Sequence, residues 1–112
     1  MKKTDKKQQY YVLSLLHTMK REKYITLWRP KNAGYTYYME AAGVYDEIKP
    51  EYHDSHISVP VEKELFESLT IEAPNKNQVL PLSKVVLKAL NLKFNGKGIK
   101  RIGDYESFTP HP

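Results

Sequence analysis

The chain has 112 residues, of which 40% are apolar and 28% charged, with a net charge of +5 and no cysteine. This length predicts a single domain spanning residues 1–112, because it supports one hydrophobic core and not a second. The absence of cysteine excludes disulfides and cysteine-bound zinc. No apolar run reaches the roughly 18 residues of a membrane span, so we expect a cytoplasmic protein with no membrane contact.

Charge is distributed unevenly along the chain. Residues 1–39 carry nine Lys and Arg against two acids, residues 40–72 carry two against nine, and residues 73–112 carry seven against two. If the two basic stretches meet in the fold, they favour an anionic partner, either nucleic acid or an acidic protein face. Alternatively, the acidic middle neutralises the basic ends within the fold, or the first lysines belong to a solvated tail.

The first third of the chain has the alternation typical of strands. Strands are predicted at 10–17, 24–29 and 35–40, which would form an antiparallel meander. In the second of them, Ile25 and Leu27 share one face and should point inward, whereas Trp28 lies on the other face. Residues 1–8 and 104–112 are polar, charged or extended, and we expect flexible tails there.

The middle of the chain loses this alternation. Residues 41–58 are interpreted as a loop, and residues 69–73 as a candidate fourth strand. Pro60 is expected in the first turn of a short helix, which carries Val61, Leu65 and Leu69 on one face.

A second helix is predicted after Pro81 and ends at Asn91. Its apolar stripe consists of Leu82, Val85, Val86, Ala89 and Leu90, and should cover the inner face of the sheet. A turn is predicted at Asn95 and Gly96. The fold class is therefore α+β, with a small antiparallel sheet of three or four strands covered by one or two short helices.

The segment 24–45 holds six of the thirteen aromatic residues and the only Trp, so it is the main candidate for a recognition surface. An aromatic platform with a polar and basic rim would be formed by the candidate binding residues Tyr24, Trp28, Arg29, Lys31, Asn32, Tyr35 and Tyr37. Bases stack on such platforms with about 1–3 kcal/mol each, and Trp, Tyr and Arg also anchor protein interfaces. Alternatively, the rings pack under the tail or the 41–58 loop as part of the core.

A weaker candidate lies near the C-terminus, where Lys97, Lys100 and Arg101 accompany three glycines that would allow close approach to a phosphate. The segment lacks the spacing of a Walker motif. The middle of the chain offers metal-binding side chains within six residues, at Glu51, His53, Asp54 and His56, but lacks the further spaced ligands of a structural site.

Catalytic signatures are lacking. His17 is a candidate proton shuttle, although a single histidine at a strand end more often makes a local hydrogen bond. There is no nucleophile elbow, zincin pair or placed pair of carboxylates. We therefore expect a non-enzymatic protein with no metal and no cofactor.

Four short runs resemble a set of small uncharacterised proteins encoded by tailed bacteriophages and prophages. The most distinctive is YITLWRPKNAGY at 24–35, and the others are SLLHT at 14–18, AAGVY at 41–45 and ISVPVE at 57–62. The resemblance implies a small basic phage accessory protein in the host cytosol, a class that often binds and blocks host machinery.

On this basis we expect an accessory binding protein that inhibits a host defence or regulatory complex, with a host protein or protein complex as its partner. A nucleic-acid-binding accessory protein, with a nucleic acid or nucleotide as its ligand, is the first alternative. A small enzyme is the second.

Overall fold

The computed structural model describes residues 8–102. The described chain contains β1 (Tyr10–Ser14), β2 (Thr26–Trp28), β3 (Tyr35–Thr36), β4 (Ser58–Glu62), β5 (Ile71–Glu72), β6 (Gln78–Val79), β7 (Leu92–Asn95) and β8 (Gly98–Arg101). Its two α-helices are α1 (Lys63–Leu69) and α2 (Lys84–Ala89). Apart from Gln8, the tails predicted at 1–8 and 104–112 lie outside the described residues.

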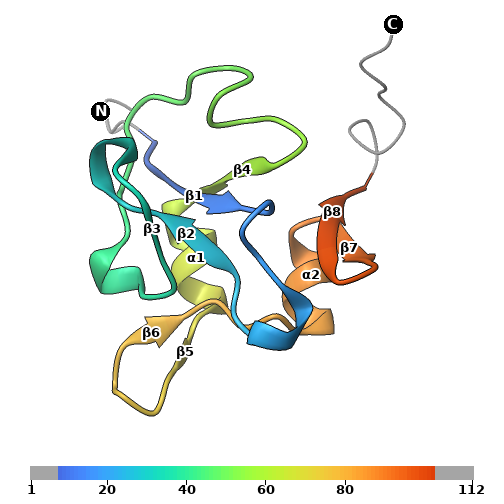
Figure 1. Ribbon diagram of the computed structural model, residues 1–112. Coiled ribbons are helices and arrows are strands. Elements are labelled where there is room, and N and C mark those ends of the chain that lie inside the picture. Colours follow the sequence, from blue (N-terminus) through green and yellow to red (C-terminus); the bar gives the residue numbers. More distant parts are fainter. Residues whose placement is uncertain (1–7, 103–112) are drawn as a thin grey trace, which may run out of the picture.

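The main sheet is antiparallel and has the strand order β3-β2-β1-β4 (Figure 1). Strand β1 pairs along its whole length with β4, from Tyr10 opposite Glu62 to Ser14 opposite Ser58. Strand β2 joins β1 on one side and β3 on the other. The α+β class and the predicted β1-β2-β3 meander are therefore confirmed, although β3 is shorter than the predicted strand at 35–40.

The fourth strand of this sheet is not the predicted one. Residues 69–73 contribute β5, which forms a separate two-stranded ladder with β6, where Ile71 lies opposite Val79. The fourth strand is β4, and the prediction that Pro60 opens a helix is wrong, because Pro60 lies within β4 opposite Val12. A proline has no N–H to donate, and it is accepted here because β4 is an edge strand.

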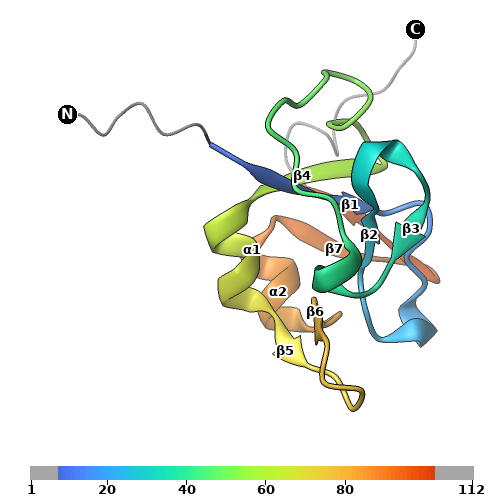
Figure 2. The same ribbon diagram turned by 90° about the vertical axis from the view of Figure 1, so that its left-hand side faces the viewer.

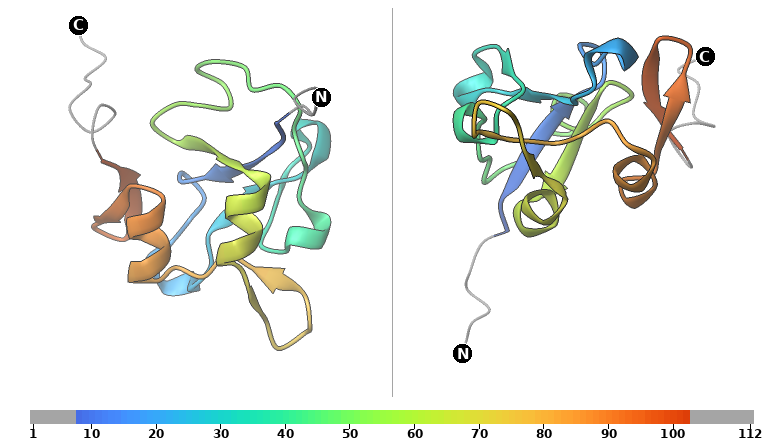
Figure 3. Two further views of the ribbon diagram at one scale, coloured as in Figure 1. Left: turned by 180° about the vertical axis from the view of Figure 1, so that it is seen from behind. Right: turned by 90° about the horizontal axis from the view of Figure 1, so that it is seen from below.

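Helix α1 packs against β1 and β4 with a face that matches the prediction only in part, since Leu69 contacts the core as predicted (Figure 3). Phe66 is completely buried, and its ring stacks on Tyr11 with centroids 4.2 Å apart. Leu65, which was predicted to face the core, is 40% exposed. Thus α1 covers the sheet mainly through one phenylalanine.

Helix α2 lies beside β7, and its buried side chains join the same core as the inner face of the main sheet, so the prediction that it covers this face is confirmed in part. Ser83 caps its first turn by accepting a hydrogen bond from the N–H of Val86, and Asn91 follows its end with φ +58°. Val86 and Leu87 are buried, whereas Val85 is 73% exposed. The buried face of α2 is therefore rotated from the predicted stripe, because it includes Leu87 instead of Val85.

The hydrophobic core lies on the side of the sheet that faces α1, and the segment after β6 closes it. Ile25 and Leu27 are completely buried there, as predicted. The N–H of Ile25 donates to the carbonyl of Leu80 at 2.9 Å, so this segment runs alongside the beginning of β2. The β7–β8 hairpin turns at Gly96, whose φ is +65°, which confirms the predicted turn.

Phe66→Ala should destabilise the protein by about 3–5 kcal/mol, because the change leaves a large cavity between α1 and β1. Val85→Ala is the matched control, since Val85 is mostly exposed and should change stability by less than about 0.5 kcal/mol. Urea denaturation of both variants measures the difference. Equal midpoints for the two variants would contradict the described packing of α1.

Candidate functional site

The segment 45–58 folds over the outer face of the main sheet, on the side away from α1 (Figures 1 and 2). It buries Trp28, which is only 8% exposed. The indole ring contacts Tyr35, Tyr52 and His53, with centroid separations of 6.1, 5.2 and 5.2 Å. Trp28 is therefore not the centre of an exposed platform, and the alternative that its ring packs under the 41–58 loop is correct.

His53 attaches this loop to the turn after β2. The backbone N–H of Lys49 donates to Nδ1 of His53 at 3.0 Å, so Nε2 carries the ring proton and donates to Oδ1 of Asn32 at 2.9 Å. Burial lowers the pKa of His53, and the nearby charge of Lys49 lowers it further. The neutral imidazole is thus held in one tautomer between two turns.

The turn after β2 is formed by the distinctive WRPKNAGY run. Lys31 and Asn32 each have a φ of +59°, a conformation that non-glycine residues rarely adopt. The hydroxyl of Tyr45 accepts the N–H of Asn32 at 3.0 Å and donates to the carbonyl of Arg29. Strained residues persist only where their surroundings hold them, and here Tyr45 does so.

Gly43 lets the AAGVY run pass close to this turn. A Cβ at this position would lie 2.8 Å from Cα of Pro30 and 2.8 Å from the ring of Tyr45, closer than real Cβ atoms come. The YITLWRPKNAGY and AAGVY runs therefore meet at one tight junction.

A half-open pocket of about 260 Å³ lies between Trp28 and the covering loop. The aromatic pocket, as we call it, is lined by Trp28, Asn32, Gly34, Tyr35, Glu51, Tyr52, Ser55, Ile57 and Ser58. Tyr35 and Tyr52 are 44% and 48% exposed, so both present ring surface to solvent.

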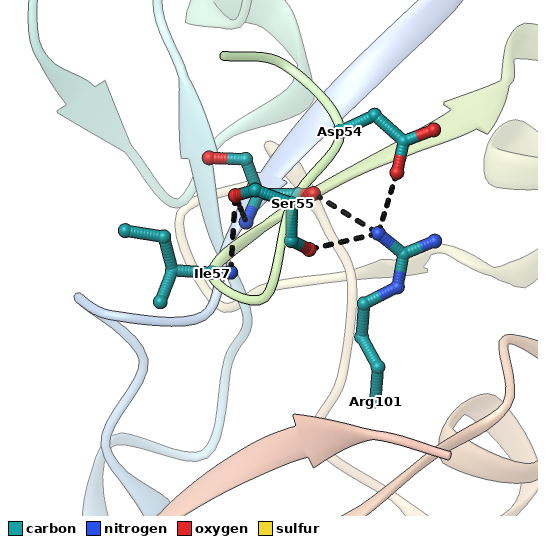
Figure 4. A network of polar contacts seen from close by, with 5 residues as sticks. Asp54, Ser55, Ile57 and Arg101 are labelled. Atoms are coloured by element: carbon teal, nitrogen blue, oxygen red, sulfur yellow. Dashed lines mark hydrogen bonds and ion pairs between the residues drawn. The ribbon is translucent and has the colours of Figure 1, made fainter. Parts of the chain in front are cut away.

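Arg101 attaches the same loop to the β7–β8 hairpin. Its Nη1 pairs with the carboxylate of Asp54 at 2.6 Å and donates to the carbonyl of Ser55 at 2.8 Å (Figure 4). This predicted anion-binding residue is therefore engaged by an acid from the middle of the chain. Here the acidic middle does neutralise a basic end, as one of the alternatives proposed.

A second hollow, the basic pocket, lies between residues 19–21 and the tip of the β7–β8 hairpin. It has a volume of about 610 Å³ and is lined by Met19, Lys20, Arg21, Gly96 and Lys97. The N–H of Lys20 donates to the carbonyl of Lys97 at 2.6 Å, which holds the two segments together. The two basic stretches of the sequence therefore do meet at this point.

An apolar groove connects the two pockets. It shares Ile57 with the aromatic pocket, and Met19 and Lys97 with the basic pocket. Lys100 also lines this groove. Leu16, Met19 and Ile57 are 62%, 36% and 46% exposed along it. We call the three adjoining hollows the recognition strip.

Only some of the predicted binding residues meet. Trp28, Asn32 and Tyr35 line the aromatic pocket. Tyr24 and Tyr37 form a separate edge-to-face pair with ring centroids 5.7 Å apart.

The remaining two, Arg29 and Lys31, are exposed on the turn and are not among the described residues that line the pocket. Sequence reasoning missed Tyr52, Ile57, Leu16 and Met19. The sequence did carry one signal for these residues. Each is a large apolar side chain in a mostly polar stretch, where it has no core position to occupy.

The remaining candidates from the sequence are the metal-binding group and His17. Among residues 8–102, no three His, Asp or Glu side chains are placed to hold a metal ion. His17 makes the local hydrogen bond expected of a strand-end histidine, with its Nδ1 2.9 Å from Oγ of Ser14. No helix within the described range is long and apolar enough to cross a membrane.

Comparison of the whole chain with protein-family models gave no match, and no curated protein or solved structure matched it significantly. The geometry of the molecule is therefore what supports a functional proposal.

The hydrogen bonds of His53 predict a pH dependence of stability. Because folding lowers its pKa below the ordinary value of 6.5, the unfolded chain binds the extra proton first. The contribution of neutral His53 to stability should be complete above about pH 6.5 and lost as the pH falls through the lowered pKa.

Urea denaturation of the wild type and His53→Gln between about pH 8 and pH 5 measures this effect, since the variant lacks the titrating ring. We expect the stability advantage of the wild type over the variant to shrink below about pH 6.5. An advantage that stays constant over the whole range would argue against the described role of His53.

Proposed function

We propose that this chain is a non-enzymatic binding protein that contacts a protein partner through the recognition strip. Of the ten large apolar side chains that are exposed in residues 8–102, five lie on this strip, namely Leu16, Met19, Tyr35, Tyr52 and Ile57. Single exposed apolar residues are normal on a soluble protein, whereas a contiguous group of them is typical of an interaction site. Tyrosines beside aliphatic residues are also common anchors of interfaces.

The charges at one end of the strip favour an acidic partner. Lys20, Arg21 and Lys97 line the basic pocket next to the exposed Met19 and Leu16. A protein segment whose apolar side chains are flanked by Asp or Glu would match both features, with the charges steering association and the apolar side chains providing contact area. The resemblance to phage accessory proteins supports a host defence or regulatory complex as the source of this partner, which the chain would inhibit by occupying it.

Nucleic acid is the second candidate, and one observation favours it. Three basic residues from two distant segments line the basic pocket, and phosphate binding requires such a group. Against it, the large apolar side chains exposed beside this pocket, Leu16 and Met19, are aliphatic, whereas single-strand binding proteins use aromatic rings for stacking.

Leu16→Asp and Ile57→Asp should each abolish binding of a protein partner, because each places a charge in the centre of the strip. Both side chains are exposed, so the fold should be retained. Val85→Asp is the matched control, since Val85 is more exposed, lies on α2 and is not among the described residues that line the strip. A photoreactive residue at position 16 would crosslink the partner in cells and so identify it. The affinity of that protein for each variant is then measured.

If the partner bound all three Asp variants equally well, the strip would not be the interface. The nucleic-acid alternative is tested by titrating DNA and RNA with increasing salt. Phosphate contacts would give a steep loss of affinity, and the triple change of Lys20, Arg21 and Lys97 to Gln would reduce the slope by about 0.7–0.9 for each lost contact. No salt-sensitive affinity is expected if the partner is a protein.

A further inference from the structure

Three aromatic residues line the aromatic pocket, and the rings of two of them contact the third edge to face. The ring of Trp28 is nearly perpendicular to those of Tyr35 and Tyr52, at 88° and 85°. All three rings line the same hollow, and the two tyrosines reach solvent. A cation within about 6 Å of a ring face is attracted by its quadrupole, and several rings around one space add their attraction.

The charge of the lining also favours a cation. Among the described residues that line the pocket, Glu51 is the single charged side chain, and no Lys or Arg lines it. The His53 ring behind Trp28 is fixed as a neutral tautomer by its two hydrogen bonds. A carboxylate at the rim of an aromatic pocket supplies the countercharge for an ammonium group.

Backbone strain lies on both sides of this pocket. Glu51 has a φ of +69° and Asn32 a φ of +59°, and both residues line it. Non-glycine residues in this conformation carry a cost, and they cluster at ligand-binding sites. The strain therefore falls on the two turns that form the sides of the pocket.

We propose that the aromatic pocket binds a methylated ammonium group, with Trp28, Tyr35 and Tyr52 providing the ring faces and Glu51 the countercharge. A methylated ammonium ion is easily desolvated and fits a small pocket, and aromatic cages are the usual way to bind it. Its source is either a free quaternary amine or a methylated lysine side chain. The inference goes beyond the proposed protein contact, because a free cation can occupy the pocket without any partner.

The single Trp of the chain allows a direct test. Trp28 fluorescence of the full chain is followed during titration with tetramethylammonium chloride, and compared with sodium chloride at equal ionic strength. We expect a saturable change with the organic cation only. Tyr52→Phe should bind like the wild type, whereas Tyr52→Leu should bind about tenfold more weakly because it removes one ring face.

Glu51→Gln should weaken binding several-fold, and it is a second variant that leaves all three rings in place. Tyr24→Leu and Glu72→Gln are the matched controls, since neither residue is among those that line the pocket. Thermal midpoints of all variants establish that they are folded. Unchanged affinity in both Tyr52→Leu and Glu51→Gln would overturn the proposal, as would the lack of a saturable response in the wild type.

Choline, a trimethyllysine peptide and the same peptide without methylation distinguish the two sources. Tighter binding of the methylated peptide than of choline identifies a protein side chain as the ligand, and equal or weaker binding identifies a free cation. Equal binding of the methylated and unmethylated peptides would overturn the proposal. Leu16→Asp should still bind the cation although it loses the protein partner. The cation-binding proposal and the protein-binding proposal can therefore fail independently.

Discussion

The hydrogen bond from Nε2 of His53 to Oδ1 of Asn32 is the contact on which the outer face of this protein depends. It joins two turns that are 21 residues apart in the sequence, one directly after β2 and one within the segment 45–58. Because this segment covers Trp28, the contact converts what would be an exposed strand face into a second, small aromatic core. The aromatic pocket is the space left between that core and the two turns.

A second side-chain contact fixes the segment 45–58 to a distant part of the chain. Arg101 binds Asp54 and the carbonyl of Ser55, the two residues after His53, and so connects the β7–β8 hairpin to the same part of the segment. Ile57 is thereby placed where the aromatic pocket meets the apolar groove. The recognition strip is therefore built from loops fixed by side-chain contacts, over a sheet that supplies rigidity. Loops carry binding residues for this reason in many small proteins.

The sequence predicted the elements whose signals are local. The β1-β2-β3 meander, the inward face of Ile25 and Leu27, and the turn of the last hairpin were all correct. The helix faces were correct only in part, because α1 and α2 have seven and six residues, and fewer than two turns cannot define a stripe uniquely. Proline is common both at helix starts and in edge strands, so the sequence alone could not decide the position of Pro60. The pairing of β4 with β1 decides it.

The candidate site was predicted only in part for a related reason. Alternation correctly placed Trp28 opposite Leu27, but exposure depends on what covers a face, and the covering segment lacks any period. Its position follows from the contacts of His53 and Arg101 with residues distant in the sequence. The same long-range contacts bring Tyr52 to the pocket, so its place beside Trp28 does not follow from a local pattern.

The burial of Trp28 beneath the segment 45–58 is most directly tested by NMR, because the chain has one Trp and therefore one indole N–H resonance. Nε1 is buried, and in the described part of the chain no oxygen or nitrogen accepts its hydrogen. Since rings surround the indole, its N–H signal should be displaced from the position of a solvated tryptophan, and its exchange with deuterium should be slow. An indole signal at the solvated position that exchanges immediately would contradict the closed loop and the pocket beneath it.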